Sequence, residues 1–170
     1  MLIDTHCHLD FADFDAERDE LVTRAHQAGV KQMVTISTRV KKLDTLLKLT
    51  ERYPSVFCSV GTHPNNAGDE LDVSADELVR LAESNEKIVA IGEAGLDYFY
   101  DTQTPEDQKT GFLRHIEAAR RTQLPLVIHS RSADEDMAAI LTDETGKGAF
   151  PFILHCFSAG QALADTGVAL

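Results

Sequence analysis

Short apolar, β-branched runs alternate with longer amphipathic segments along the whole chain. Each apolar run predicts a strand, and the segment after it has apolar residues at helical spacing. Runs such as IVAIG and PLVIH are apolar at successive positions, which is typical of strands buried on both faces of a parallel sheet. The predicted strands cover residues 2–6, 32–37, 56–61, 88–93, 126–129 and 152–155, and the predicted helices cover 14–28, 40–53, 74–84, 106–122, 133–142 and 159–170.

This alternation indicates βα units, in which each helix returns the chain to start the next parallel strand. Two α/β architectures contain such units: an open doubly wound sheet and a TIM-type (β/α)8 barrel. Polar residues recur where the predicted strands end, and a barrel collects its chemistry at that rim. The sequence therefore favours a TIM-type barrel of which about six βα units are present, forming one domain over residues 1–170.

The first predicted strand ends in two histidines separated by one residue. Successive side chains of a strand point to opposite faces, so His6 and His8 share a face while Cys7 points the other way into packing. Their Cα atoms should lie roughly 7 Å apart, a distance that two imidazoles can close around one ion. An isolated pair of this kind is as consistent with two structural histidines, so the rest of the chain must decide.

Other strand ends carry further ligand-type side chains. Glu93 ends one predicted strand, His129 and His155 end two more, and His63 follows a fourth. With His6 and His8, the set offers imidazoles and one carboxylate, which suits two divalent ions bridged by Glu93. Imidazole ligands favour Zn²⁺ or Mn²⁺. By contrast, His26 and His115 lie in predicted helices, where a solvated face is expected.

Composition and charge narrow the class of protein. The chain has 170 residues, of which 43% are hydrophobic, and no apolar run approaches the roughly 20 residues of a membrane span, so a cytoplasmic protein is expected. Three cysteines without C-x-x-C spacing predict reduced packing residues. A net charge of −12 argues against an extended phosphate-binding surface, so any contact with nucleic acid must be local.

Five sequence blocks together resemble the TatD family of metal-dependent deoxyribonucleases within the amidohydrolase-like barrels: IDTHCHLD, GTHP, GEAGLDYFY, IHSR and LHCFS. The blocks are spread over essentially the whole chain, in the family's order and spacing. The resemblance implies hydrolysis of phosphodiesters, at DNA ends or in a smaller substrate, and it allows Mg²⁺ as the working ion. It also implies that one metal is held by His6, His8 and Glu93, and the second by Glu93, His129 and His155.

Three further residues have two readings each. His63 could contact a substrate phosphate or stabilise the turn before Pro64, and Arg131 could bind a phosphate bidentately or be an ordinary surface arginine. Asp97 could orient a ligand histidine or cap the loop after Gly95. Together with the ligand set above, these readings make Glu93 and His63 the candidate catalytic residues. The candidate substrate-binding residues are His63 and Arg131.

A complete (β/α)8 barrel has about 250 residues, more than this chain supplies. The resemblance also implies an aspartate on a later strand that contacts the first metal, and no residue here corresponds to it. We therefore expect a fragment or truncated form, or a sheet completed by a partner. Exposed strand edges would then favour self-association.

Three alternatives remain open at this level. An amidohydrolase acting on a small ester or amide could use the same scaffold, but many such barrels bridge their metals with a carbamylated lysine where this chain has Glu93. Phosphoesterase barrels with three metals require further histidines and aspartates that are not found. From another class, the chain could be a metal-binding protein with weak or no catalytic activity, because the later aspartate is missing.

Overall fold

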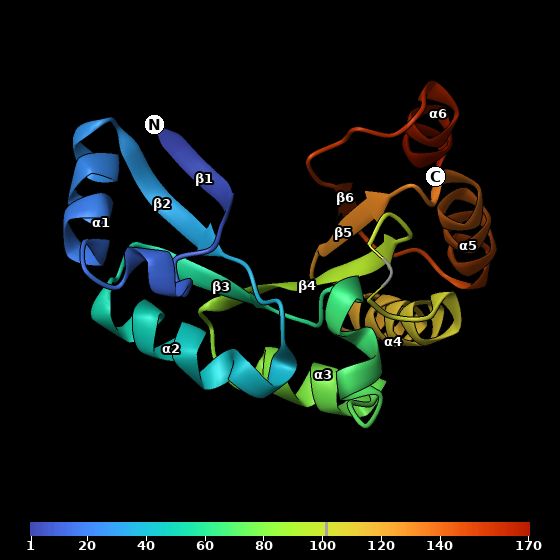
Figure 1. The fold of residues 1–170 in the computed structure, drawn as a ribbon, viewed down its shortest axis with the longest axis horizontal. Helices are drawn as coiled ribbons and strands as arrows, with labels where there is room; N and C mark the ends of the chain where they lie inside the picture. Colours follow the sequence, from blue (N-terminus) through green and yellow to red (C-terminus); the bar gives the residue numbers. More distant parts are fainter. Residues whose placement is uncertain (101) are drawn as a thin grey trace.

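The computed structural model describes residues 1–100 and 102–170, and its six strands form one parallel sheet in the order of the sequence. Each strand pairs with the next, so β1 and β6 are the edges. Figure 1 shows that the sheet curls into an arc, an incomplete barrel whose open side lies between β1 and β6. The strands are β1 (Leu2–Cys7), β2 (Val30–Thr35), β3 (Val56–Val60), β4 (Ile88–Asp97), β5 (Leu126–Arg131) and β6 (Phe152–Leu154).

Helices cover the outer, convex face of the arc (Figure 1). Each strand is followed by a helix, which confirms the six predicted βα units. Short 3-10 helices η1 (Ala12–Phe14), η2 (Val40–Lys42) and η3 (Pro64–Glu70) precede the first three. The α-helices are α1 (Arg18–Gln27), α2 (Leu43–Arg52), α3 (Ala75–Glu83), α4 (Pro105–Thr122), α5 (Asp134–Lys147) and α6 (Gln161–Ala169).

The main hydrophobic core lies between the sheet and these helices. Ile91 and Leu96 of β4 are fully buried there with Phe112 and Ile116 of α4, which removes large apolar side chains from water. Two helices begin with a side-chain cap: Ser74 accepts a hydrogen bond from the amide of Glu77, and Thr104 accepts one from the amide of Asp107. The packing of helices against the convex face of the sheet thus fixes the position of the carboxyl ends of the strands.

The strands β4 and β5 extend past their predicted ends, and this changes where the polar residues lie. Glu93 is inside β4 rather than at its end, because the segment up to Asp97 continues to pair with β5. Gly95 allows this pairing: a Cβ there would lie 2.0 Å from the carbonyl oxygen of His129. In the motif GEAG the glycine therefore lets β4 and β5 approach closely beside the candidate ligands.

Three predictions about individual side chains were wrong. His115 is only 3% exposed, because α4 turns this residue toward the sheet instead of toward solvent. His26 is half-buried and bonds to the carbonyl of Val30 and the hydroxyl of Ser55. Cys156, expected in packing, is exposed beyond the end of β6, whereas Cys58 is buried and the Sγ of Cys7 faces the carbonyl of Val34 as predicted.

Within the described ranges, no helix is both long and apolar enough to cross a membrane. The edge strand β1 leaves Leu2 and Ile3 exposed, and Ile153 is exposed on β6 at the other edge. Self-association through these edges stays a prediction.

Candidate metal centre

The carboxylate of Glu93 is the centre of a histidine cluster at the carboxyl end of the sheet. This side chain is almost completely buried, with 2% of the residue exposed. Five imidazoles surround it, delivered by the ends of β1, β3, β5 and β6. The barrel geometry thus collects residues that are distant in sequence, as the strand-end pattern predicted.

One oxygen of Glu93 faces the histidines of the first strand. The Oε2 atom lies 3.3 Å from Nε2 of His6 and 4.0 Å from Nε2 of His8. The Nδ1 of His8 lies 3.2 Å from the carbonyl of Ile36, so Nδ1 carries the proton and Nε2 keeps a lone pair directed at the centre. These three residues form what we call the first half of the centre.

The other oxygen of Glu93 faces histidines from β5 and β6. The Oε1 atom lies 2.9 Å from Nδ1 of His129 and 2.6 Å from Nε2 of His155. The Nε2 of His63 is 3.7 Å from the same oxygen and 3.2 Å from Nδ1 of His129. We call Glu93, His129, His155 and His63 the second half. The ring of His155 also stacks on the ring of His6, with centroids 4.1 Å apart, which joins the two halves.

Two groups of three residues bring their ligand atoms within 4.8 Å of one another: His6, His8 and Glu93, and His63, Glu93 and His129. The first is the predicted ligand set of the first metal. The second contains His63 where the resemblance implied His155. Hydrogen bonding distinguishes the two, because Nδ1 of His63 accepts the amide of Asn65 and a neutral ring then carries its proton on Nε2. His63 is therefore arranged as a donor, and His155 remains the predicted ligand.

A buried carboxylate orients His129 from behind. The Oδ2 of Asp97 lies 3.0 Å from Nε2 of His129, so this nitrogen donates to it while Nδ1 faces Glu93. The Oδ1 of Asp97 accepts the amides of Phe99 and Tyr100. Asp97 thus caps the following loop and also contacts His129, so it would orient that ring if His129 is a ligand, which stays a prediction.

Gln108 on α4 supports Asp97 in turn. Its Oε1 accepts the amide of Asp97 at 2.7 Å, and its Nε2 donates to the carbonyl of the same residue at 2.9 Å. Both residues are 1% exposed. These bonds fix the backbone of Asp97 in a buried position.

A second buried network supports the loop that carries His63. The Nε2 of His115 accepts the amide of Thr62, the neighbour of His63, at 3.0 Å, and its Nδ1 donates to the carbonyl of Gly111 at 2.7 Å. The hydroxyl of Thr62 donates to the carboxylate of Glu70, which also accepts the amides of Val40 and Lys41. The loop before His63 is thus held by side chains from α4 and η3.

Sequence reasoning missed Gln108, His115 and Glu70. A signal for two of them was present in α4, where Gln108 and His115 share a helical face with Phe112, Ile116 and Ala119. A polar residue within such an apolar stripe is expected to be buried and hydrogen-bonded. Glu70 is the last residue of the 3-10 helix η3, a short segment that offers no comparable periodicity.

Burial and hydrogen bonding shift the protonation of the cluster. Burial alone would raise the pKa of Glu93, but hydrogen bonds from His129, His155 and His6 outweigh it and hold that pKa well below its usual range. Burial likewise lowers the pKa of His129, yet its bonds to Glu93 and Asp97 prevail and raise it. For His63, burial dominates and lowers the pKa to about 4, so this ring is neutral near pH 7.

Arg131 stacks against two aromatic side chains. Its guanidinium lies over the ring of Phe99, with Cζ 3.9 Å from the ring centroid, and Cζ is 4.8 Å from the centroid of Tyr100. A cation stacked in this way keeps its N–H groups available in the plane of the guanidinium. Binding of a phosphate by Arg131 stays a prediction.

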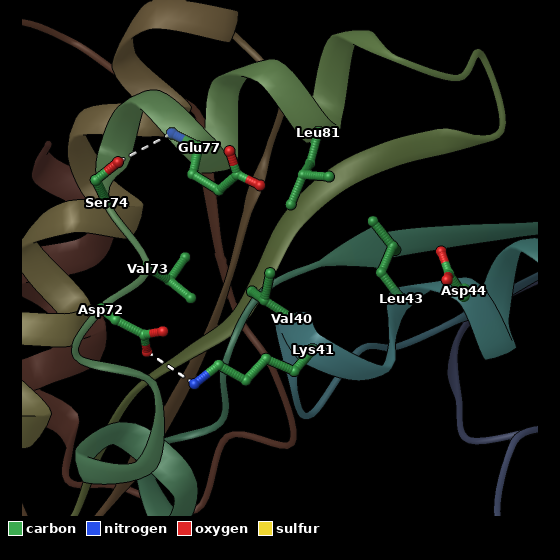
Figure 2. Close-up of a pocket in the computed structure, with 9 residues that line it drawn as sticks. All are labelled: Val40, Lys41, Leu43, Asp44, Asp72, Val73, Ser74, Glu77 and Leu81. Carbon is green, nitrogen blue, oxygen red and sulfur yellow. Dashed lines mark hydrogen bonds and ion pairs between the residues drawn. The ribbon is translucent and has the colours of Figure 1, made fainter.

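Two hollows of similar size differ in their chemistry. One of about 430 Å³ lies at the cluster and is lined by Glu93, His8, His63, His129 and His155, with Phe11 and Asn65 at its sides. The other, of about 500 Å³, lies between the start of α2 and α3. In Figure 2 the ion pair of Lys41 with Asp72 crosses it, and Ser74 caps α3 beside it. Its lining contains no histidine, so the first hollow is the candidate site.

The donor set fits divalent metal ions. Partly buried imidazoles gathered around one buried, ionised carboxylate are suitable ligands for Zn²⁺, Mn²⁺ or another transition-metal ion. The two oxygens of Glu93 face different imidazole groups, as a carboxylate bridging two ions would require. The cluster is thus compatible with divalent metal binding.

Comparison with known proteins gives consistent relatives. The family model described as TatD related DNase matches residues 3–170. The metal-dependent hydrolase YabD of Bacillus subtilis is 34% identical over 166 residues, which are 96% of this chain and 64% of that protein. The 3'-5' ssDNA/RNA exonuclease TatD of Salmonella typhimurium is 34% identical over 173 residues, with 98% and 65% covered.

A solved structure shares the fold. The crystal structure of YJJV, a TatD homologue from Escherichia coli, matches with a TM-score of 0.88 at 32% identity, covering 99% of this chain and 64% of that one. The match confirms the α/β barrel fold with incomplete coverage. The chain spans just under two thirds of the length of these relatives.

Proposed function

This chain belongs to the family of TatD-related DNases, and from that membership we propose that it hydrolyses phosphodiester bonds at the ends of DNA with two divalent ions. The relative from Salmonella typhimurium bears the name of a 3'-5' exonuclease. This name supports degradation in the 3'-5' direction for the present chain as well. Zn²⁺, Mn²⁺ and Mg²⁺ are the candidate ions. The net charge of −12 is compatible with an anionic substrate because bound cations supply positive charge locally.

The observation that carries the proposal is the placement of Glu93 between two imidazole groups. Its Oε2 faces the first half of the centre and its Oε1 faces the second half. A carboxylate that serves two ions at once fixes the spacing between them, and paired ions are the usual arrangement for in-line attack on phosphate.

The protein residues have separate tasks in this proposal. His6, His8, His129 and His155 would hold the ions together with Glu93, and Asp97 would position the ring of His129 for this role. The ions would activate a water molecule and neutralise charge on the phosphate oxygens. The neutral ring of His63 donates from Nε2 to a substrate phosphate oxygen that enters the hollow.

Two measurements on the purified chain test the proposal. The metal content is determined by mass spectrometry, and release of nucleotides from short single-stranded DNA is followed with added Mg²⁺, Mn²⁺ or Zn²⁺. We expect bound metal and metal-dependent release in the wild type, and neither in Glu93→Gln. His26→Gln is the matched control, because His26 is a half-buried histidine bonded outside the cluster.

The outcomes separate the proposal from its alternatives. Metal bound without release of nucleotides indicates a metal-binding protein without turnover. Release of product from small esters or amides alone indicates an amidohydrolase. If Glu93→Gln retains both metal and activity, the site assignment itself is wrong.

A further inference from the structure

Phe99, Tyr100 and Arg131 form an exposed group of two aromatic rings and one cation, which we call the aromatic platform. Phe99 is 58% exposed and Tyr100 is 46% exposed. Their rings meet edge to face at 4.9 Å, and the Arg131 guanidinium lies over both. The cation holds the rings in a defined arrangement while a large aromatic surface remains in water.

The platform lies at the carboxyl ends of the two strands that carry Glu93 and His129: Arg131 is the last residue of β5, and Phe99 and Tyr100 follow β4. Gly95 pairs with His129 in the sheet and Asp97 pairs with Arg131, so Arg131 is two residues further along β5 than the ligand. Two residues of a strand span roughly 7 Å. Figure 1 shows the ends of β4 and β5 side by side at this point.

The same carboxylate supports the platform and the metal centre. One oxygen of Asp97 contacts His129, and the other accepts the amides of Phe99 and Tyr100. Since Gln108 fixes the backbone of Asp97, the rings are positioned relative to the ligand histidine by a buried structure. The exposed rings are therefore held in place beside the candidate site.

We propose that the aromatic platform is a subsite that stacks the base of the nucleotide next to the phosphate bound at the metal centre. This inference rests on the proposed function. An aromatic face binds any base without sequence preference, but the base must be unstacked from its neighbours, so the subsite selects single-stranded ends. The in-plane N–H groups of Arg131 reach the backbone phosphate of the same nucleotide.

Charge supports this type of ligand over an apolar peptide. The chain carries a net charge of −12, so a polyanion is repelled by most of the protein and needs a local cation. Arg131 supplies that cation inside the platform. A single-stranded end offers both components, a base for the rings and a phosphate for the guanidinium.

The test compares binding of two fluorescein-labelled oligothymidylates of equal length, one of them abasic at its 3'-terminal nucleotide, by fluorescence anisotropy with chelator present. The phosphates are the same, so any difference reports the base. We expect the wild type to bind the intact oligonucleotide about fivefold to a hundredfold more tightly than the abasic one. In the double variant Phe99→Leu with Tyr100→Leu that preference should be lost.

Two further variants complete the design. Arg131→Lys keeps the charge without the planar stack, and we expect it to lose part of the preference. Phe57→Leu is the matched control, because Phe57 also carries a cation, Lys87, at 4.3 Å from its ring, but lies near the start of β3. It should keep the wild-type preference. Circular dichroism confirms folding of each variant.

Each outcome has one meaning. Equal binding of the two oligonucleotides by the wild type overturns the platform while leaving the proposed function intact. Preserved preference in the double variant also overturns it. If the wild type binds neither oligonucleotide and releases no nucleotide with metal, the proposed function and the platform fail together.

Discussion

The two halves of the metal centre share Glu93 but are built with different degrees of support. In the second half, His129 and His155 lie closer to the carboxylate than His6 and His8 do, and His129 is held by buried Asp97, which Gln108 supports. His6 and His8 come from the edge strand β1, which is largely exposed, and Nε2 of His8 is 4.0 Å from Glu93. Among the described residues, Nδ1 of His6 has no hydrogen-bond partner.

From this difference we predict that the fold organises the second half, whereas the first half would be ordered only when an ion binds. A site whose lone pairs are already directed loses little conformational entropy when an ion binds. In the first half, binding of an ion must also order the exposed edge strand β1, which costs additional conformational entropy. We therefore expect stronger metal binding in the second half, and the following experiments test that expectation.

Glu93→Gln should have the largest effect, because it alters the only residue that both halves share. The neutral amide removes the charge and one of the two oxygens. Changes outside the ligand shell already weaken binding about tenfold to a hundredfold, so we expect more than a hundredfold loss at both halves. Isothermal titration with Zn²⁺ or Mn²⁺ measures this loss of affinity. Glu77→Gln on α3, outside the centre, is the control. Loss at one half only would show that the halves do not share this carboxylate.

His115→Gln should change how stability depends on pH. Burial lowers the pKa of His115 to about 4, so the native ring stays neutral while the unfolded chain takes up a proton below its ordinary value of 6.5. The stability contributed by the neutral ring is complete above pH 6.5 and is lost as pH falls toward 4, by about 3 kcal/mol.

Urea unfolding at pH 7 and pH 4, with metal removed by chelator, checks this prediction. The variant should lose about 3 kcal/mol less than the wild type over that interval. A constant difference between the two proteins at both pH values would mean that His115 does not titrate in this way. In that case His115 would no longer count among the buried residues that support the second half.

Asp97→Asn separates the two halves directly. The amide keeps an oxygen for the amides of Phe99 and Tyr100 but removes the charge that orients His129. We expect metal binding to weaken about tenfold to a hundredfold in the second half and to stay unchanged in the first. Titration should then show one altered and one unaltered transition. Equal weakening of both would show that the halves act as a single unit.

Arg18→Gln should have the smallest effect, and only on the first half. Arg18 donates to the carbonyls of Leu9 and Phe11, just after His8, and so ties down the loop that follows β1. We expect a loss of metal affinity of only a few-fold there, since no ligand or partner of a ligand is removed. A loss as large as that of Asp97→Asn would contradict the proposed difference in support.

The sequence predicted the six βα units and brought the candidate ligands to one rim because both depend on local periodicity. His6 and His8 could be paired from the alternation of a single strand, and strand ends identified Glu93, His129 and His155. The supports of these residues could not be predicted in the same way. Gln108, His115 and Glu70 act through α4 and η3, and their contacts depend on how those elements pack against the sheet.

The stacked rings of His6 and His155 have a consequence for the order of folding. His6 lies in the edge strand β1 and His155 directly follows the edge strand β6, so this contact joins residues that are far apart in the sequence. Contacts of such long range form late, after local βα units have assembled. Ions bound on the two sides of Glu93 would therefore connect the β1 end of the sheet to the β6 end across the open side of the arc. Its main effect would be on the rate at which the folded chain opens, more than on the rate at which it forms.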